Sequence, residues 1–468
     1  MLHNVARSRP VVISAHGDRA DSFRLWYLGN VNVRAFHLPQ IACRSRLENS
    51  GSITLELPVL DRSAMVTLTG ALQQAARSTL ATIPTDELLP RLQRIAEHWL
   101  DPDFGPRRDA ELLLAETTGY SPAMLRHGLS LHFAPLVEDA IGRLMDIEIG
   151  ARQRADACRG SVITHVLSGN IPGLAAAPTL LGLAAKSAVL LKAAAGEPLF
   201  PALFAASIAS LDPELGRCVA AVYWPGGDVH LEESAFAGSE VVTAAGSDAA
   251  IASIAARVKC RFIGHGHRIS FAAVGRSATA SETEARWVAE RLAADVSLWD
   301  QQGCLSPQLC FYETGGTISV QTFAGWVGDA LDRWAQELPP RSLSLDERAA
   351  VARFRAEAEW APGGMLLAGE DTRWTVALEP DSPFRLSCLN RCLRLIPLAN
   401  LDEIALRIEP HRPHLEACGL AETAPRRQHL EELLARGGVH RICEIGEMQR
   451  PTLAWRQGGR PRFADYLV

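Results

Sequence analysis

The sequence has few aromatic residues, little net charge and no long apolar run, and each absence narrows the class of protein. Aromatic residues make up 6% of the 468 residues, and the formal net charge is −6 with neutral histidines. Surfaces that bind nucleic acids or anionic membranes are basic, and those that bind single strands also carry aromatic stacking platforms. We therefore expect neither nucleic acid nor an anionic membrane as a partner.

The apolar segments are too short or too interrupted to cross a membrane. The longest, from Ile171 to Leu191, contains Pro172, Pro178 and Lys186, whereas a spanning helix needs about 20 predominantly apolar residues. A buried helix followed by a strand explains this stretch better. The first residues show no apolar core with a cleavage site, so no export signal is expected and the protein is predicted to be cytoplasmic.

The ten cysteines form no Cys-x-x-Cys pair and have no regular spacing. Structural zinc and iron–sulfur sites need such clusters, so no metal site is expected. Scattered cysteines in a long chain are typical of a reduced, cytoplasmic protein.

The first part of the chain is predicted to change from strands to helices. Short strand-like runs separated by turn-forming residues fill about the first 75 residues, at 11–14, 23–29, 31–38, 52–60 and 64–70. Between about 71 and 146 the apolar spacing becomes helical, with amphipathic helices beginning at Thr85, near Arg107 and at Ser121.

From residue 162 onward, strands alternate with helices, which indicates βαβ units on parallel sheets. A second series begins near residue 268, so two α/β domains are expected to face each other across a cleft. Residues 338–364 are predicted to be a surface excursion with a helix of its own. The predicted strands are 162–168, 187–192, 218–224, 240–246, 261–266, 268–275 and 307–313, and the predicted helices are 172–185, 198–211, 248–258, 281–298 and 318–336.

Neither a Gly-x-Gly-x-x-Gly motif nor a P-loop is present, but three weaker features occupy the ends of predicted strands. They are Ser168-Gly169-Asn170, Lys192 and Gly246-Ser247. Free backbone N–H groups at a strand-to-helix junction suit a phosphate. Ordinary turn chemistry and a solvated lysine explain each feature equally well when it is taken alone.

Cys304 lies in Gln-Gln-Gly-Cys-Leu-Ser-Pro-Gln, where Gly303 permits close approach and Ser306-Pro307 favour a tight loop. A cysteine in such a loop can present its sulfur and its own N–H to one substrate atom, as a thioacyl intermediate requires. A buried structural cysteine is the alternative, and these neighbours do not decide between the two.

The run 299–308 (Trp-Asp-Gln-Gln-Gly-Cys-Leu-Ser-Pro-Gln) resembles the signature of LuxC-type acyl-CoA reductases, a branch of the aldehyde dehydrogenase superfamily. The stretches 167–173, 223–228, 264–271 and 438–448 agree in order and spacing, and the resemblance extends from about residue 85 to 468. It implies an α/β, aldehyde dehydrogenase-like fold. The implied parts are a strand-rich N-terminal extension (1–80), a Rossmann-type NAD(P)-binding domain (81–265) with an oligomerisation β-hairpin near 147–166, a catalytic domain (266–440) and a C-terminal oligomerisation segment (441–468).

The resemblance also implies roles for individual residues. Cys304 matches the nucleophile, and Asn170 matches the side chain that stabilises the oxyanion together with the Cys304 N–H. The implied cofactor contacts are Lys192 to the adenosine ribose, Gly246 and Ser247 to the pyrophosphate, and His267 near the nicotinamide, although hydrogen bonding at a strand end would also explain the pair His265 and His267.

Two departures from the superfamily pattern bear on the reaction. Gly264 stands where hydrolytic aldehyde dehydrogenases have the glutamate that activates water, so the acyl group is expected to pass to CoA or hydride. No acidic residue stands at Ala195 or Gly196, where NAD-selective relatives have one, and this favours NADPH. The contacts that a second superfamily glutamate makes to the nicotinamide ribose have no counterpart in 386–390.

The sequence therefore predicts an enzyme that reduces a fatty acyl-CoA or acyl carrier protein thioester to the aldehyde with NADPH, through a thioacyl group on Cys304. An aldehyde dehydrogenase working in the oxidising, CoA-acylating direction is the main alternative, and a non-catalytic acyl-transfer subunit is another. An acyl-transferring partner enzyme and a homo-oligomer, a dimer or tetramer joined through 147–166 and 462–468, are also expected.

Overall fold

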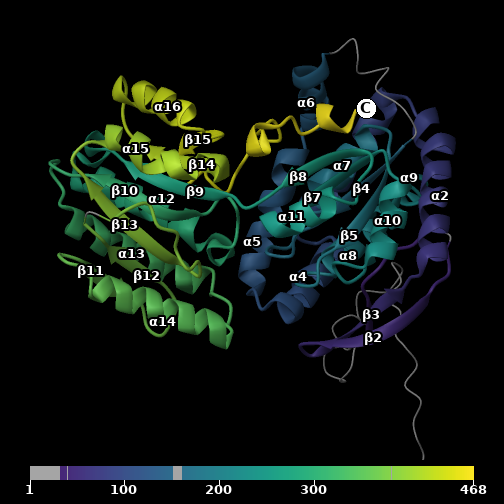
Figure 1. Ribbon diagram of the computed structural model, residues 1–468, viewed down its shortest axis with the longest axis horizontal. Coiled ribbons are helices and arrows are strands. Elements are labelled where there is room, and N and C mark those ends of the chain that lie inside the picture. Colours follow the sequence, from purple (N-terminus) through teal and green to yellow (C-terminus); the bar gives the residue numbers. More distant parts are fainter. Residues whose placement is uncertain (1–31, 40, 151–160, 381, 468) are drawn as a thin grey trace, which may run out of the picture.

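The computed structural model describes residues 32–39, 41–150, 161–380 and 382–467, and it consists of two α/β lobes (Figure 1). The N-terminal lobe surrounds a five-stranded sheet, and the C-terminal lobe surrounds a seven-stranded sheet. Within the described ranges, every helix is too short or too polar to cross a membrane.

The sheet of the N-terminal lobe is parallel throughout, with the strand order β6-β5-β4-β7-β8. All six residues of β5 are buried, as expected where helices cover both faces of a sheet. Chain order reverses between β4 and β7, so their carboxyl ends form the crevice in which open α/β sheets bind ligands. The elements are β4 (Val162–Val166), α7 (Ala176–Ala184), β5 (Ala188–Ala193), α8 (Phe200–Leu211), α9 (Pro213–Gly216), β6 (Val219–Tyr223), α10 (Val229–Ala237), β7 (Val241–Ala245), α11 (Asp248–Ala255) and β8 (Arg261–His265).

Helices α3 to α6 lie between the N-terminal extension and this sheet, and the predicted helical region is confirmed. The Ser121 side chain caps α5 by accepting a hydrogen bond from the Met124 N–H, and Pro122 occupies its first turn. The Trp99 ring of α3 packs on Phe133 of α5, with ring centroids 5.1 Å apart. The bounds are α3 (Thr85–Leu100), α4 (Gly105–Thr118), α5 (Pro122–Phe133) and α6 (Ala140–Ile149).

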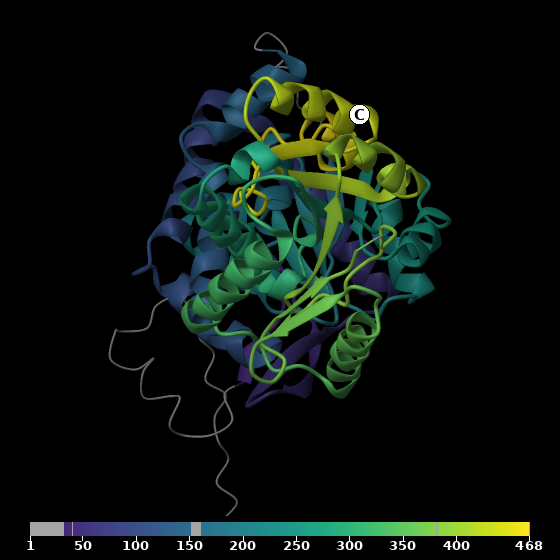
Figure 2. The ribbon, with the colours of Figure 1, turned by 90° about the vertical axis from the view of Figure 1, so that its left-hand side faces the viewer.

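The C-terminal lobe has the strand order β11-β12-β13-β10-β9-β14-β15, and only β11 is antiparallel to its neighbour among these described strands (Figure 2). Helices α12 and α13 pack on one face, and α15 and α16 on the other. The helix predicted within residues 338–364 is present and is α14. The elements are β9 (Ile269–Val274), α12 (Glu282–Ser297), β10 (Pro307–Glu313), α13 (Val320–Glu337), α14 (Leu345–Glu359), β11 (Met365–Ala368), β12 (Thr375–Leu378), β13 (Cys392–Leu398), α15 (Ile404–Ile408), β14 (Leu415–Ala421), α16 (Arg426–Arg436) and β15 (Arg441–Glu444).

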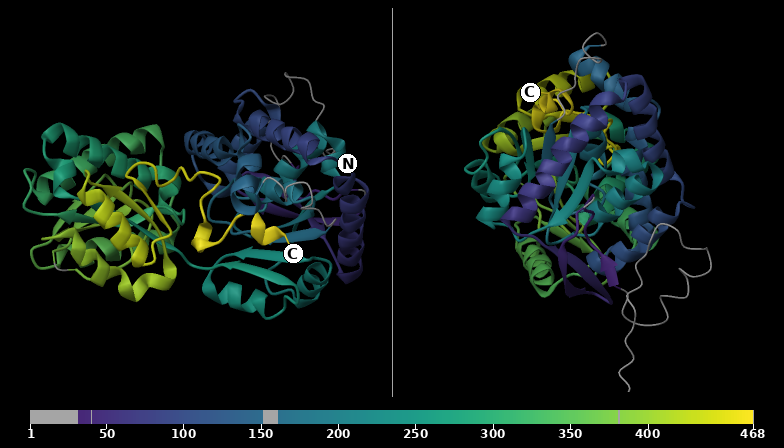
Figure 3. Two further views of the ribbon diagram at one scale, coloured as in Figure 1. Left: turned by 90° about the horizontal axis from the view of Figure 1, so that it is seen from above. Right: turned by 90° about the vertical axis from the view of Figure 1, so that its right-hand side faces the viewer.

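The N-terminal extension contains a helix where a strand was predicted. It forms a three-stranded sheet and then α2, which runs along the N-terminal lobe (Figure 3). The strand predicted at 64–70 is wrong, because the buried residues of this stretch recur at helical spacing and Asp61 caps the helix by accepting from the Ala64 N–H at 2.8 Å. The runs 11–14 and 23–29 lie outside the described residues. The bounds are β1 (Asn32–Arg34), β2 (Arg44–Ser50), β3 (Ile53–Val59) and α2 (Arg62–Ser78).

The strand pairing adds detail to three of the predicted segments. His37 and Ala221 exchange backbone hydrogen bonds of 2.8 and 2.9 Å, so the extension lies along β6 and shares the core of the N-terminal lobe. Residues 162–166 form the central strand β4 instead of a hairpin, and residues 441–444 form β15 at the edge of the C-terminal sheet. Residues 151–160 of the predicted hairpin lie outside the described residues, and a role of either segment in oligomerisation stays a prediction.

The two lobes meet through Trp299, whose indole lies against Gly128 of α5. A Cβ at Gly128 would lie 2.0 Å from Trp299 Cζ2, whereas a Cβ at Gly70 in the exposed part of α2 would meet nothing within 4 Å. We expect Gly128→Ala to lower the free energy of unfolding by about 1–3 kcal/mol through overpacking. Gly70→Ala is the matched control and should raise it by about 0.5–1 kcal/mol, since alanine is the better helix former. Denaturant titration of both variants measures these changes, and a stabilised Gly128→Ala would contradict the packing.

Candidate active site

A cavity of about 570 Å³ lies between the two lobes. Its walls come from the carboxyl ends of β4, β7 and β8, the end of α5, the loop before β10 and the C-terminal residues. It therefore lies at the β4–β7 switch point of the N-terminal sheet. The predicted site residues that line it are Cys304, Asn170, Gly246, Ser247 and His267.

Lys192 is the predicted site residue that does not line this cavity. It is the penultimate residue of β5 and pairs in register with Val166 of β4, so it belongs to the same sheet edge one strand away. Its ammonium lies 5.9 and 6.0 Å from the ring centroids of Tyr223 and Trp224. Burial lowers the pKa of Lys192, and the nearby Glu232 carboxylate opposes that shift.

The loop that presents Cys304 begins with a left-handed turn. Trp299, Asp300 and Gln301 have φ values of 54°, 49° and 67°. Residues with a Cβ lose about 1 kcal/mol or more each in this conformation, so surrounding contacts must hold the turn.

The Asp300 carboxylate, which is buried, supplies the strongest of those contacts. It accepts hydrogen bonds from Arg391 Nε at 2.8 Å and from the Arg341 N–H at 3.0 Å. The Gln301 side chain donates to the Pro307 carbonyl at 2.7 Å and accepts from the Cys392 N–H at 2.9 Å. The turn is thus fixed to the start of β13 and of β10.

Trp299 and Tyr120 join this turn to the N-terminal lobe. The Tyr120 hydroxyl lies 3.1 Å from the Asn170 carbonyl and 3.2 Å from the Trp299 carbonyl, within hydrogen-bonding distance of both. The Trp299 ring lies 5.2 Å from the Tyr120 ring and 5.7 Å from the His132 ring. The loops of Cys304 and Asn170 are therefore held together across the lobe boundary.

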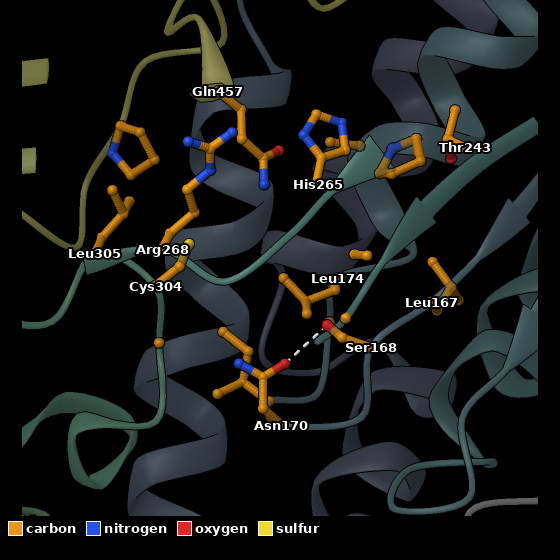
Figure 4. Close-up of a pocket in the computed structure, with 18 of the residues that line it drawn as sticks. Leu167, Ser168, Asn170, Leu174, Thr243, His265, Arg268, Cys304, Leu305 and Gln457 are labelled. Atoms are coloured by element: carbon orange, nitrogen blue, oxygen red, sulfur yellow. Dashed lines mark hydrogen bonds between the residues drawn. The ribbon is translucent and has the colours of Figure 1, made fainter. Parts of the chain in front are cut away.

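Cys304 is half-buried, with its sulfur beside Arg268 (Figure 4). Its carbonyl accepts from the Ser270 hydroxyl at 2.7 Å, while its N–H meets no backbone or side-chain oxygen of the described residues. Burial raises the pKa of Cys304 to about 12 and Glu416 adds to the rise, whereas Arg268 and Arg462 oppose it. Since the thiolate is the nucleophilic form, the positive charges favour reactivity.

The amide of Asn170 is oriented toward the loop of Cys304. Its Oδ1 accepts from the Ser168 hydroxyl at 2.8 Å (Figure 4), and its Nδ2 donates to the Gln302 carbonyl at 2.7 Å. One of the two N–H bonds of Nδ2 stays available for another acceptor.

Histidines and the C-terminal segment complete the cavity walls. Burial lowers the pKa of His132 and of His265 to about 4 and that of His165 to about 3, so all three are neutral near pH 7. Sequence patterns did not indicate that His132 and His165 lie here, because buried histidines show no local pattern. The same holds for the cavity residues Gln457, Arg460, Arg462 and Tyr466, which lie more than 150 residues after Cys304.

The cavity offers no free carboxylate among its described residues. Asp465 is the single acidic residue in its lining, and its two oxygens accept from Arg261 and Arg460 at 2.7 and 2.8 Å. Gly264 is the penultimate residue of β8, and an added Cβ there would lie 2.7 Å from Ile251 Cγ2, so a glutamate side chain does not fit without a shift.

The buried ion pair of Asp300 and Arg391 leads to a prediction about the stability of the protein. Arg391→Met leaves the Asp300 carboxylate buried without its cation, and we expect the free energy of unfolding to fall by about 3 kcal/mol at about pH 8. Burial raises the pKa of Asp300, and loss of Arg391 raises it further, so the folded variant binds the proton more tightly than the unfolded chain does. Its stability relative to the wild type therefore improves as the pH falls toward about 5.

Arg286→Met is the matched control for that variant. Arg286 forms a pair with Glu282 on an exposed helix face, and loss of such a pair changes stability by at most about 1 kcal/mol. Denaturant titration at both pH values compares the two variants. Equal losses would contradict the central role of Arg391.

Comparison with known sequences identifies the family. Residues 80–460 match the sequence model of the family described as acyl-CoA reductase (LuxC). A long-chain acyl-protein thioester reductase from Aliivibrio fischeri is 24% identical over 382 residues, which cover 77% of this chain and 76% of the relative. One from Photorhabdus luminescens is 24% identical over 418 residues, which cover 85% and 83%.

Comparison with solved structures identifies the fold. An oxidoreductase from Marinobacter aquaeolei has a TM-score of 0.70 at 14% identity, covering 91% of this chain and 93% of its own. The aldehyde dehydrogenase KauB from Pseudomonas aeruginosa has 0.68 at 13%, covering 88% of each. An NADP-dependent glyceraldehyde-3-phosphate dehydrogenase from Bacillus halodurans, solved with NADP, has 0.65 at 12%, covering 91% and 94%. The predicted aldehyde dehydrogenase-like fold and the resemblance are confirmed: the chain is an oxidoreductase that belongs to the acyl-CoA reductase (LuxC) family.

Proposed function

We propose that the protein reduces a fatty acyl thioester, of CoA or of an acyl carrier protein, to the aldehyde through a thioacyl group on Cys304. The observation that carries the proposal is the position of Cys304, half-buried in the switch-point cavity with its N–H bonded to no oxygen of the residues that the structure describes. The substrate class follows the relatives, which are named long-chain acyl-protein thioester reductases.

The acylation step uses groups of the chain itself. The Cys304 thiolate attacks the thioester carbonyl, and a carbon–sulfur bond forms as the carbonyl oxygen takes up the negative charge. The Cys304 N–H and the free N–H of Asn170 donate to this oxyanion. The tetrahedral centre then collapses, the bond to the CoA or carrier sulfur breaks, and the departing thiolate takes a proton from water.

Hydrolysis of the acyl group is not favoured in this cavity, because no free carboxylate among the described lining residues is available to activate water. Asp465 is held by two arginines, and Gly264 leaves no room for a carboxylate at the end of β8. A thioester without an activated water persists until hydride or a second thiol reaches it. Reduction, rather than hydrolysis to the acid, is therefore the expected fate of the acyl group.

The residues at the switch point fit a nicotinamide dinucleotide. Gly246 and Ser247 precede the first turn of α11, where free backbone N–H groups suit a pyrophosphate, and His267 lines the same cavity. Lys192, at the neighbouring strand end, would hold the adenosine ribose. When bound, the nicotinamide supplies the hydride that reduces the acyl carbon.

Glu197 supports NADPH as the form used. It is the first acidic residue after Lys192, but its carboxylate accepts from the N–H groups of Leu199 and Phe200 at the start of α8, at 3.0 and 2.6 Å. This carboxylate is buried, and burial raises the pKa of Glu197 to about 7, so its repulsion of a 2′-phosphate is weaker than that of an exposed carboxylate.

The first test concerns the thioacyl group. We expect long-chain acyl-CoA, incubated without NADPH, to add one acyl mass to the wild-type protein, and Cys304→Ala to lose both this adduct and aldehyde formation. Cys260→Ala is the matched control, because Cys260 is half-buried outside the cavity and should leave both unchanged. Intact-mass spectrometry and an aldehyde assay provide the readouts. Aldehyde formation by Cys304→Ala would overturn the proposal.

The second test concerns the cofactor. Fluorescence titration should show tighter binding of NADPH than of NADH, and Lys192→Ala should weaken NADPH binding by about tenfold through loss of one charged contact. Lys259→Ala, at an exposed position, is the control. Equal binding of both dinucleotides would contradict the preference for NADPH.

The alternatives give different results in the same assays. An aldehyde dehydrogenase working in the oxidising direction would turn over aldehyde, CoA and NADP faster than acyl-CoA and NADPH. A non-catalytic acyl-transfer subunit would form the acyl adduct but bind neither dinucleotide.

A further inference from the structure

The C-terminal segment after β15, residues 445–467, crosses from the C-terminal lobe to the N-terminal lobe and forms one wall of the cavity (Figures 1 and 3). We call it the C-terminal strap. The Gly458 N–H donates to the Glu416 carboxylate at 3.0 and 3.1 Å. Near its end, Glu148 accepts from the N–H groups of Arg462, Phe463 and Ala464 at 2.9, 2.8 and 2.8 Å.

These two anchors fix the position of Arg462 in the cavity wall. Its backbone is held by Glu148, and its guanidinium lies 5.8 Å from the centre of the Trp455 ring. No carboxylate, carbonyl or hydroxyl of the described residues accepts a hydrogen bond from this guanidinium.

The other arginines of the cavity are compensated. Arg268 lies 3.4 Å from Glu416 and donates to the Pro413 carbonyl at 3.2 Å, and Arg460 donates to Asp465 at 2.8 Å. Arg462 differs from these two arginines because its guanidinium forms no ion pair with a described carboxylate, and Glu148, which interacts with it at longer range, is held by backbone N–H groups.

We propose that Arg462, supplied by the strap, is the cation that stabilises the Cys304 thiolate. Both residues line the same cavity. Around Cys304, Arg268 and Glu416 form an ion pair at 3.4 Å, so their charges oppose each other at the sulfur, whereas Arg462 forms no such pair with a described carboxylate. Among the groups that lower the pKa of Cys304, Arg268 and Arg462 are the two cations. The inference rests on the proposed role of Cys304.

Other titratable or charged groups face this pair from each neighbouring element. The histidines are neutral near pH 7, and Glu148 is occupied by backbone N–H groups. They are His132 of α5, Glu148 of α6, His265 of β8, Arg268 of the β8–β9 connection, Glu416 of β14, and Asp465 and Tyr466 of the strap.

The test measures the rate at which iodoacetamide alkylates Cys304 as a function of pH, followed by peptide mass spectrometry on the full-length protein. Arg462→Gln removes the charge, so the pKa of the thiol should rise and alkylation near neutral pH should slow by about tenfold for each unit of rise. Arg462→Lys keeps a cation and should restore most of the wild-type profile.

Two controls distinguish the effect of the Arg462 charge on Cys304 from a general disturbance of the structure. Arg456→Gln makes the same change at an exposed position of the strap outside the cavity lining, and it should keep the wild-type profile. Alkylation of Cys260 within each sample should not change. If Arg462→Gln does not fold, Arg462→Met keeps the apolar stem and serves as the neutral variant.

The outcomes distinguish this inference from the proposed function. An unchanged alkylation profile in Arg462→Gln, or a profile in Arg462→Lys as slow as that of the neutral variant, would overturn the role of Arg462. If the neutral variant shifts the profile while Cys304→Ala still forms aldehyde, the role of Cys304 fails and that of Arg462 as its electrostatic partner stands. A shifted profile together with a lost acyl adduct in Cys304→Ala supports both.

Discussion

The buried pair of Asp300 and Arg391 holds the site together. It fixes a left-handed turn whose residues, Trp299 to Gln301, would not adopt that conformation by themselves. The segment that supplies Arg391 is left-handed as well, with φ values of 61°, 57° and 58° at Leu389, Asn390 and Arg391. Two unfavourable turns thus stabilise each other, and between them they set where the Cys304 loop begins.

The same turn joins the two lobes. Its Trp299 side chain fills the space left by Gly128, and Tyr120 lies within hydrogen-bonding distance of the carbonyls of Trp299 and Asn170. The proposed nucleophile and the proposed oxyanion donor come from different lobes, so their relative position depends on this contact. A small change in the packing of the two lobes would therefore move Cys304 relative to Asn170 without exposing the hydrophobic core.

The electrostatics of the cavity are consistent with a thioester reaction in which no group activates water for hydrolysis. Its buried histidines His132, His165 and His265 are neutral near pH 7, and Asp465 is already paired. A half-buried thiol in such surroundings resists ionisation, and cations must favour the thiolate. The C-terminal strap places Arg462 in the cavity wall, and in the proposed role this residue would be one such cation.

Much of the fold could be predicted from the sequence, because parallel strands buried on both faces and amphipathic helices leave clear apolar patterns. The run 187–192 and the helix starts at Thr85 and Ser121 are examples, and the order of the motifs around Asn170, Gly264 and Cys304 indicated the family. The prediction at 64–70 was wrong, because its β-branched residues favoured a strand. The structure has the helix α2 there, which buries Met65, Leu68 and Leu72 at helical spacing.

The tertiary structure alone decided what surrounds Cys304. Arg391, Glu416 and Arg462 lie more than 80 residues after it in the chain, and no spacing rule connects them to it. Their approach depends on the order β10-β9-β14-β15 and on the strap that returns to the N-terminal lobe. The sequence by itself determined which sulfur is the candidate nucleophile, and only the folded chain determined the charges that govern its reactivity, because electrostatic interactions depend on distance in space and not on separation along the chain.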